Sequence, residues 1–369
     1  MRNAGPDHTI SRFDFRLFHF AAGEAVLFSS HSLTFRYIPR GFSMNVRHLV
    51  VLLLASPALI VAAEPAITMK RGQGTVDFLA GEVLVARYHH GAEVAKPYFW
   101  PMATPGGVHV TRAWPMEKGA PKETTDHVHQ KSAWFCHGDV IPEGIELTAR
   151  IKGVTGVDYW SENKGHGKIV TTGIEEGKDG ALMTRNEWRT SDGQKILDEK
   201  RTIVVRKAAK GFLVIVETEL TANVCPITFG DTKEGSFGVR VSDQLRLTAG
   251  NPKSQMVNSA GQSGEKACWG HFADWCDYSG EVDGKIAGIA VFDDPANKHR
   301  ACWHARGYGL MAANPFGRAH AGFPGRKGQT ELVKLAKGEI LKLRYGIYLH
   351  DGDVKDGQVA EAFALFAGK

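Results

Sequence analysis

The chain has 369 residues, of which 43% are hydrophobic, and a formal net charge of +5. Six arginines and three acidic residues precede Glu64, so the rest of the chain carries a formal charge near +2, which gives no electrostatic basis for binding nucleic acid. The hydrophobic content is normal for a globular core, and the roughly 306 residues from Glu64 onward are enough for one large β domain or two ordinary ones.

Residues 44–63 are typical of a signal peptide, with a short basic start, an apolar run and small residues before a cleavage point. The apolar run is about 15 residues long, contains Pro57, and is shorter than the roughly 20 residues needed to span a bilayer. We therefore predict an exported protein, periplasmic or extracellular, without stable membrane insertion once cleavage leaves Glu64 at the N-terminus. Residues 1–43 are interpreted as an extension from a start codon placed too early.

Alternating or continuous apolar runs predict several β-strands. These cover residues 82–89, 145–154, 186–190, 195–203, 201–206, 212–220, 236–241, 286–293 and 341–349. Residues 341–349 alternate with period two, whereas 212–220 are apolar at nearly every position and are expected to be buried on both faces. Between 190 and 195 the sequence indicates a hairpin turn in which Gly193 takes a positive φ.

Glycine recurs between these runs at intervals of roughly 8 to 15 residues, which is typical of a sandwich or barrel. Helical periodicity is clear only over residues 359–366. No repeat or low-complexity linker divides residues 64–369, so they are predicted to form a single domain. We predict an all-β fold, a large antiparallel β-sandwich with a short C-terminal helix.

Four segments concentrate polar and aromatic residues in a way that core packing does not require. The first, residues 96–115, clusters aromatic and proline residues with Arg112. This segment lines a cleft or, alternatively, plugs the space between two sheets.

The second segment, residues 125–140, contains two histidines separated by one residue. If this part is extended, His127 and His129 project from one face, about 6.5 to 7 Å apart. Such a pair can chelate a metal or supply a general acid or base near neutral pH. His137 and Asp139 follow on a predicted loop. The alternative is that one histidine packs in the core and the other is solvated.

The third segment, residues 230–241, places Asp231, Lys233, Glu234 and Arg240 at the mouth of a strand, with glycines that allow close backbone approach. An exposed charged turn is the alternative.

The fourth segment, residues 302–317, combines aromatic residues with histidine, arginine and asparagine: Trp303, His304, Arg306, Tyr308 and Asn314. Aromatic faces beside such groups suit a sugar, because its CH faces stack on rings while its hydroxyls take hydrogen bonds. A packed loop that ends a strand is the alternative.

The chain has five cysteines, all after residue 63, where an oxidising compartment permits disulfides. Cys268 and Cys276 flank a tryptophan-rich segment and are the pair expected to form a bridge. Buried free thiols are the alternative, and no CxxC pair indicates zinc.

These segments carry a family resemblance. The motifs P-Y-F-W-P, R-x-W-P, D-H-x-H-x-x-x-x-W-F-x-H-G-D-V, G-D-T-K-E-G, H-A-R-G-Y-G-L-x-A-A-N-P-F-G and L-R-Y-G-I-Y-L-H-D-G-D resemble the PmoA-like family of exported bacterial proteins. The resemblance covers most of residues 64–369. It implies a β-sandwich similar to the galactose mutarotase supersandwich and carbohydrate metabolism outside the cytoplasm. The family label is methane oxygenase, but residues 64–369 contain no apolar run of spanning length to support a membrane oxygenase.

We therefore hypothesise a carbohydrate-active enzyme that uses histidine and carboxylate acid–base chemistry, of the epimerase, lyase or hydrolase class. The expected catalytic residues are His127, His129 and Glu234. Residues expected to contact a carbohydrate or other small-molecule substrate are Arg306, Asn314, Trp303, His304, Tyr308, Arg112, Lys233 and Arg240. The cofactor is left open. One alternative is a metal-dependent enzyme whose divalent metal is held by His127, His129 and Asp139, and another is a noncatalytic carbohydrate-binding protein.

Overall fold

The computed structural model describes residues 66–118 and 123–368, which lie in one compact unit, Ala62–Lys369. The predicted upstream extension and signal peptide, residues 1–63, lie outside the described residues. Every strand pairing between the described strands is antiparallel.

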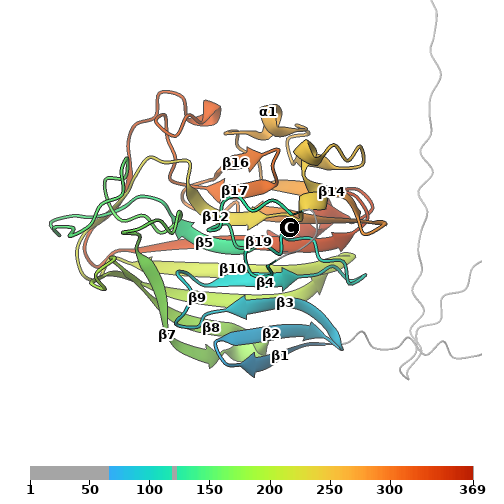
Figure 1. Cartoon of the computed structure of the whole chain (residues 1–369), viewed down its shortest axis with the longest axis horizontal. Coiled ribbons are helices and arrows are strands. Elements are labelled where there is room, and N and C mark those ends of the chain that lie inside the picture. The colour runs from blue at the N-terminus through green and yellow to red at the C-terminus, as the bar shows by residue number, and fades with distance from the viewer. Residues whose placement is uncertain (1–65, 119–122, 369) are drawn as a thin grey trace, which may run out of the picture. The chain divides into compact units, whose positions relative to one another are not determined.

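The first of two eight-stranded sheets carries the N-terminal strands and the central part of the chain (Figure 1). Its strands, in spatial order, are β1 (Ile67–Gly72), β2 (Thr75–Ala80), β3 (Val83–His89), β4 (Tyr98–Met102), β5 (Ala133–His137), β12 (Gly235–Arg240), β17 (Leu310–Asn314) and β16 (Cys302–Arg306).

The second eight-stranded sheet contains the longest strands. In spatial order they are β13 (Gln255–Asn258), β14 (Trp275–Val282), β15 (Lys285–Asp293), β19 (Ile340–Asp351), β10 (Gly211–Thr221), β9 (Lys195–Ala208), β8 (Leu182–Arg189) and β7 (Lys168–Glu176). A small third sheet joins β18 (Val333–Leu335), β11 (Ile227–Phe229) and β6 (Val140–Pro142).

Helices are few and short in the described residues. The α-helices are α1 (Glu265–Cys268) and α2 (Val359–Phe366), and the 3₁₀ turns are Lys178–Gly180, Asp243–Leu245, Leu247–Ala249 and Pro324–Arg326.

Aromatic side chains join the inner faces of the two large sheets. Phe135 of β5 packs edge-on against Trp188 of β8, with ring centroids 6.0 Å apart. Phe237 of β12 stacks on Tyr345 of β19 at 4.9 Å. These rings belong to one buried cluster drawn from both sheets, so the fold is a β-sandwich.

The outer face of the second sheet is covered by α2. Phe363 and Phe366 of this helix pack with Leu213 and Ile215 of β10 and with Phe292 of β15. The alternate residues of β10 face the inner cluster instead. This arrangement explains why residues 212–216 are apolar at every position, whereas Glu217, farther along the outer face, is exposed.

The structure confirms the predicted all-β class, the antiparallel sandwich and the C-terminal helix, and most predicted strands fall within observed ones. Gly193 takes φ of 91° in the predicted hairpin turn. The strand predicted over residues 145–154 is wrong. Ile145 and Leu147 pack against the core, but residues 145–154 form no strand.

All five cysteines are buried free thiols. Cys268 and Cys276 are not bridged, although their thiols lie within hydrogen-bonding reach of each other. The predicted disulfide between Cys268 and Cys276 is therefore not formed, although the two sulfur atoms are neighbours.

Candidate functional site

The outer face of the first sheet carries the candidate site. Side chains alternate across a strand, so Phe135 and Phe237 on the inner face place Trp134 and Arg240 on the outer face. Through the pairing of β12, β17 and β16, His304 shares this outer face with Gly238.

Two tryptophans form the floor of this face. Trp134 meets Trp160 edge to face, with centroids 5.0 Å apart. A Cβ atom on Gly238 would lie 2.8 Å from Trp134 and 3.2 Å from Trp160. Glycine at position 238 therefore leaves the space that the two indoles occupy.

The two predicted catalytic histidines lie on a turn over this floor. We call residues 124–130 the histidine turn. It is not extended, as the sequence predicted: His127 has a left-handed φ of 43°, and its carbonyl accepts a hydrogen bond from the Gln130 amide at 2.9 Å. The turn still brings the His127 and His129 rings to 5.7 Å of each other, edge to face.

A buried arginine holds the histidine turn from below. Arg112 is fully buried and donates to the carbonyl oxygens of Asp126 (3.0 Å), His127 (2.8 Å) and Gln130 (3.2 Å). It also pairs with the Asp126 carboxylate at 2.8 Å. These bonds use the guanidinium to fix the turn, so Arg112 is a positioning residue rather than the predicted substrate contact.

Arg240 of β12 also holds the histidine turn in place. It is fully buried and donates to Gln130 Oε1 at 2.6 Å and to Asp126 Oδ1 at 3.0 Å. Its guanidinium also lies 4.7 Å from the centre of the Tyr308 ring. Arg240 thus joins the histidine turn to Tyr308, and it too is committed to internal partners.

His127 sits between a carboxylate and an aromatic ring. Its Nδ1 lies 2.8 Å from Asp126 Oδ2, and its ring stacks on Tyr308 with centroids 5.2 Å apart. Although burial acts to raise it, Arg240 and the hydrogen bond from His127 lower the pKa of Asp126 to about 2. Asp126 is therefore ionised at neutral pH and orients the imidazole.

His129 has a different environment. Burial, followed by the charge of Lys96, lowers the pKa of His129 to about 3. Lys96 itself is buried, where it donates to Trp160 O at 3.2 Å and pairs with Glu162 at 2.6 Å. His129 is therefore neutral at ordinary pH and able to accept a proton.

Glu234 lies on the turn that leads into β12. Burial raises its pKa, and the charge of Asp158 adds to the effect, against the opposing charges of Lys233 and Arg306. Glu234 also acts electrostatically on Tyr308, the ring on which His127 stacks. Glu234 thus acts electrostatically on a ring that contacts the histidine turn, and its raised pKa widens the pH range over which its carboxyl is protonated.

Two predicted substrate contacts instead hold the turn that bears Glu234. His304 Nδ1 lies 2.8 Å from Lys233 O, and Asn314 Nδ2 donates to Thr232 O and Lys233 O at 2.9 and 3.1 Å. The Asn314 oxygen accepts the amides of Phe316 and Gly317. Both side chains are buried. Burial also lowers the pKa of His304 to about 3, which keeps it neutral.

The predicted stacking residue Trp303 points to the inner face. It is fully buried, and its Nε1 donates to Ala273 O at 3.0 Å. Trp269 is partly exposed on the outer side instead, where the Arg306 guanidinium lies 5.4 Å from its ring and 5.5 Å from the Tyr308 ring. Arg306 keeps one-third of its side chain exposed while pairing with Glu265 at 2.9 Å.

Asp139 does not join the histidines. Its carboxylate accepts the Gly156 amide at 2.6 Å, and it lines a separate cavity of about 450 Å³ together with Lys233 and Asp231. His137 lies at the end of β5, not on a loop, with Nε2 2.9 Å from Gly230 O. Within residues 66–118 and 123–368, no three His, Cys, Asp or Glu side chains converge as metal ligands, so the proposed ligand set is not assembled.

Sequence reasoning missed three contributors to the site: Trp160, Glu162 and Asp126. Asp126 directly precedes the H-x-H motif, and a carboxylate next to a histidine was a usable signal. Trp160 and Glu162 lie in an irregular segment whose place over the sheet follows only from the fold.

Comparison with known proteins gives a family but no activity. A family model described as "Family of unknown function (DUF6807)" matches residues 75–364. No curated protein matches the chain. Among solved structures, a polysaccharide lyase is similar at 14% identity and a TM-score of 0.31, covering 81% of this chain and 34% of that chain. A 4-alpha-glucanotransferase from Thermococcus litoralis is similar at 11% identity and a TM-score of 0.24, covering 77% and 37%.

This chain therefore spans about a third of the length of each of these two structures. At such TM-scores neither likeness bears on function. No helix within the described part of the chain is long and apolar enough to cross a membrane.

Proposed function

We propose that this chain, which belongs to the DUF6807 family of unknown function, is an exported carbohydrate-active enzyme that works by proton transfer. His129 and Glu234 are its catalytic residues, and the His127–Asp126 pair assists them. Export rests on the predicted signal peptide at residues 44–63.

One observation carries the proposal. Burial displaces the pKa values of His129 and Glu234 in opposite directions, that of His129 down to about 3 and that of Glu234 upward. A neutral histidine can accept a proton and a protonated carboxyl can donate one, so the two groups are complementary between the pKa of His129 and the raised pKa of Glu234. In each cycle the proton taken by one group is balanced by the proton given by the other.

The surrounding groups favour a carbohydrate substrate. Tyr308 and Trp269 flank Arg306 and are partly exposed, so a sugar ring can stack on an aromatic face while its oxygens meet the guanidinium. Arg306 is the predicted substrate contact that keeps an exposed, charged fork beside the histidine turn. The buried Arg112, Arg240 and Asn314 act by holding the two turns in place.

The test is turnover of a panel of neutral and acidic oligosaccharides by the purified chain. New reducing ends identify a hydrolase, an unsaturated product identifies a lyase, and a changed stereocentre without new ends, seen by proton NMR, identifies an epimerase. We expect His129→Ala and Glu234→Gln each to lower kcat by about 10² or more while the melting temperature stays nearly unchanged.

Matched controls are His109→Ala and Glu146→Gln, which replace exposed residues that have no role in the site. Both controls should keep the wild-type rate. Glycan binding without turnover of any panel member would instead make the chain a carbohydrate-binding protein. Unfolding of both site variants would make the pair structural and would end the acid–base proposal.

A further inference from the structure

Two adjoining cavities lie away from the histidine turn, beside the edge strand β16. Their volumes are about 700 Å³ and about 1010 Å³, and Lys298, His299 and Arg326 line both. Arg318 lines the larger one. Neither cavity includes any residue of the histidine turn or Glu234.

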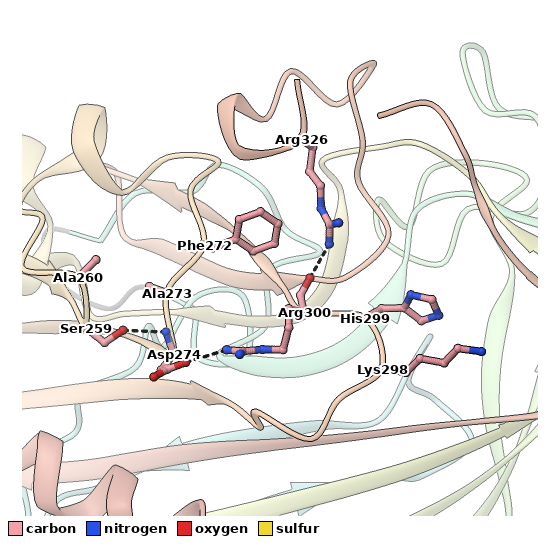
Figure 2. A pocket seen from close by; sticks show the side chains of 9 residues that line it. All are labelled: Ser259, Ala260, Phe272, Ala273, Asp274, Lys298, His299, Arg300 and Arg326. Atoms are coloured by element: carbon pink, nitrogen blue, oxygen red, sulfur yellow. Dashed lines mark hydrogen bonds and ion pairs between the residues drawn. The ribbon is translucent and has the colours of Figure 1, made fainter. Parts of the chain in front are cut away.

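Most of the positive charge around these cavities has no carboxylate partner. Only Arg300 is neutralised, through Asp274 at 2.9 Å and Asp293 at 2.7 Å. Figure 2 shows Arg300 turned toward Asp274, with Lys298 and His299 on its other side. Within residues 66–118 and 123–368, no ion pair forms at Lys298, Arg318 or Arg326, which belong to the same wall.

Two of these cations are held in place by neutral oxygens. Arg318 is only 6% exposed, and its guanidinium donates to the carbonyl oxygens of Pro315, Gly317 and Glu331. Arg326 donates to Arg300 O at 2.6 Å and to Gln329 Oε1 at 3.0 Å. A buried guanidinium without an anion is costly, so Arg318 favours an anion from outside, and the half-buried Arg326 adds a second charge on the same cavity.

The nearby acids do not cancel this charge. Asp231 is occupied by the backbone amides of Arg318, His320 and Ala321. Glu331 lines the larger cavity and is exposed; its carbonyl accepts a hydrogen bond from Arg318, and its carboxylate acts on Arg318 electrostatically without forming an ion pair within residues 66–118 and 123–368. Burial lowers the pKa of His299, and the charges of Arg318, Lys298 and Arg326 lower it further, so three cations converge on this ring.

An apolar surface adjoins the cations. Phe272 lines the smaller cavity and is 41% exposed, and the Arg326 guanidinium lies 4.6 Å from the centre of its ring. Figure 2 shows the Phe272 ring beside the Arg326 side chain. A ligand here can place a ring against Phe272 and an oxyanion against the cations.

We propose that the cavities lined by Lys298, His299, Arg318 and Arg326 form a second binding site, which takes the carboxylate or sulfate group of a ring-bearing ligand. Lys298 contributes an exposed charge, Arg326 a charge held by two hydrogen bonds, and Arg318 a buried charge. This site goes beyond the proposed acid–base function and does not depend on it.

The test is isothermal titration calorimetry of the purified full chain at low salt with three probes: a galacturonate trisaccharide, a sulfated disaccharide and a neutral trisaccharide. We expect at least one anionic probe to bind, with an affinity that falls as salt screens the charges, and the neutral probe not to bind. The two anionic arms decide between a carboxylate and a sulfate as the source of the oxyanion.

Lys298→Gln and Arg326→Gln should each weaken the bound probe about tenfold, which is the loss of one charge-assisted contact. Lys337→Gln, an exposed lysine outside both cavities, is the matched control and should leave affinity unchanged. His129→Ala should also bind normally, which separates this site from the acid–base site. Failure of both anionic probes to bind, or equal binding by the double variant Lys298→Gln/Arg326→Gln, overturns the proposal.

Discussion

Replacing Arg112 with alanine removes the main support of the histidine turn. The side chain makes four hydrogen bonds of 2.8 to 3.2 Å, three to carbonyl oxygens and one to a carboxylate oxygen of Asp126. Burial, together with the neighbouring Arg240, lowers the pKa of Arg112 to about 10, so the guanidinium remains charged at neutral pH. The variant would leave carbonyl groups under the turn without donors.

Removing one partner from a buried charged network costs about 3 to 5 kcal/mol. Arg240 still binds Asp126 and Gln130 in the variant, so we expect the lower end, about 3 kcal/mol. For a domain of this size that loss corresponds to a fall in melting temperature of roughly 5 to 10 °C. Differential scanning calorimetry measures the shift, and hydrogen exchange should show faster exchange at residues 124–130.

Arg185→Ala is the matched control, because Arg185 pairs with Glu175 on the surface and is 62% exposed. Exposed ion pairs contribute about 0 to 1 kcal/mol, so its melting temperature should hardly change. If Arg112→Ala has the same melting temperature as Arg185→Ala, and hydrogen exchange at residues 124–130 is unchanged, then Arg112 does not hold the histidine turn.

Two further predictions concern the core. Glu199→Gln should lower the free energy of unfolding by about 3 kcal/mol or more, because it leaves the buried Arg201 guanidinium uncompensated. The surface variant Glu175→Gln is the control and should unfold at the wild-type temperature. Equal melting temperatures for the two variants would contradict this prediction. Burial raises the pKa of Cys136 to about 12, so iodoacetamide at pH 8 should modify it only after denaturation, as mass spectrometry can show; rapid labelling of the native chain would refute its burial.

The sequence was sufficient for elements whose burial follows the strand period. The strands at residues 212–220 and 341–349 and the helix at 359–366 were predicted because their apolar patterns reflect two sheet faces and one helix face. Residues 145–154 were predicted from a similar apolar pattern, yet they form no strand. Whether a segment pairs as a strand depends on the rest of the sheet, and the segment's own sequence pattern does not show it.

The candidate site was predicted in part. The structure joins His129, His127, Tyr308 and Arg306 through successive ring and guanidinium contacts, whereas Glu234 is linked to them only by its electrostatic effect on Tyr308. The motifs did not distinguish an arginine that faces substrate from one that binds its own backbone, and Arg112 and Arg240 proved to be of the second kind. For neighbouring Trp303 and His304, the register of β16 decides which side chain faces the core.

The pH dependence of kcat/KM on a turned-over oligosaccharide tests the acid–base account most directly. The reactive state requires neutral His129, with a pKa of about 3, and protonated Glu234, whose pKa burial raises. The rate should therefore be highest at acidic pH and should fall as pH rises through the Glu234 pKa. A rate that instead climbs between about pH 6 and 7, where an ordinary histidine loses its proton, would contradict the account.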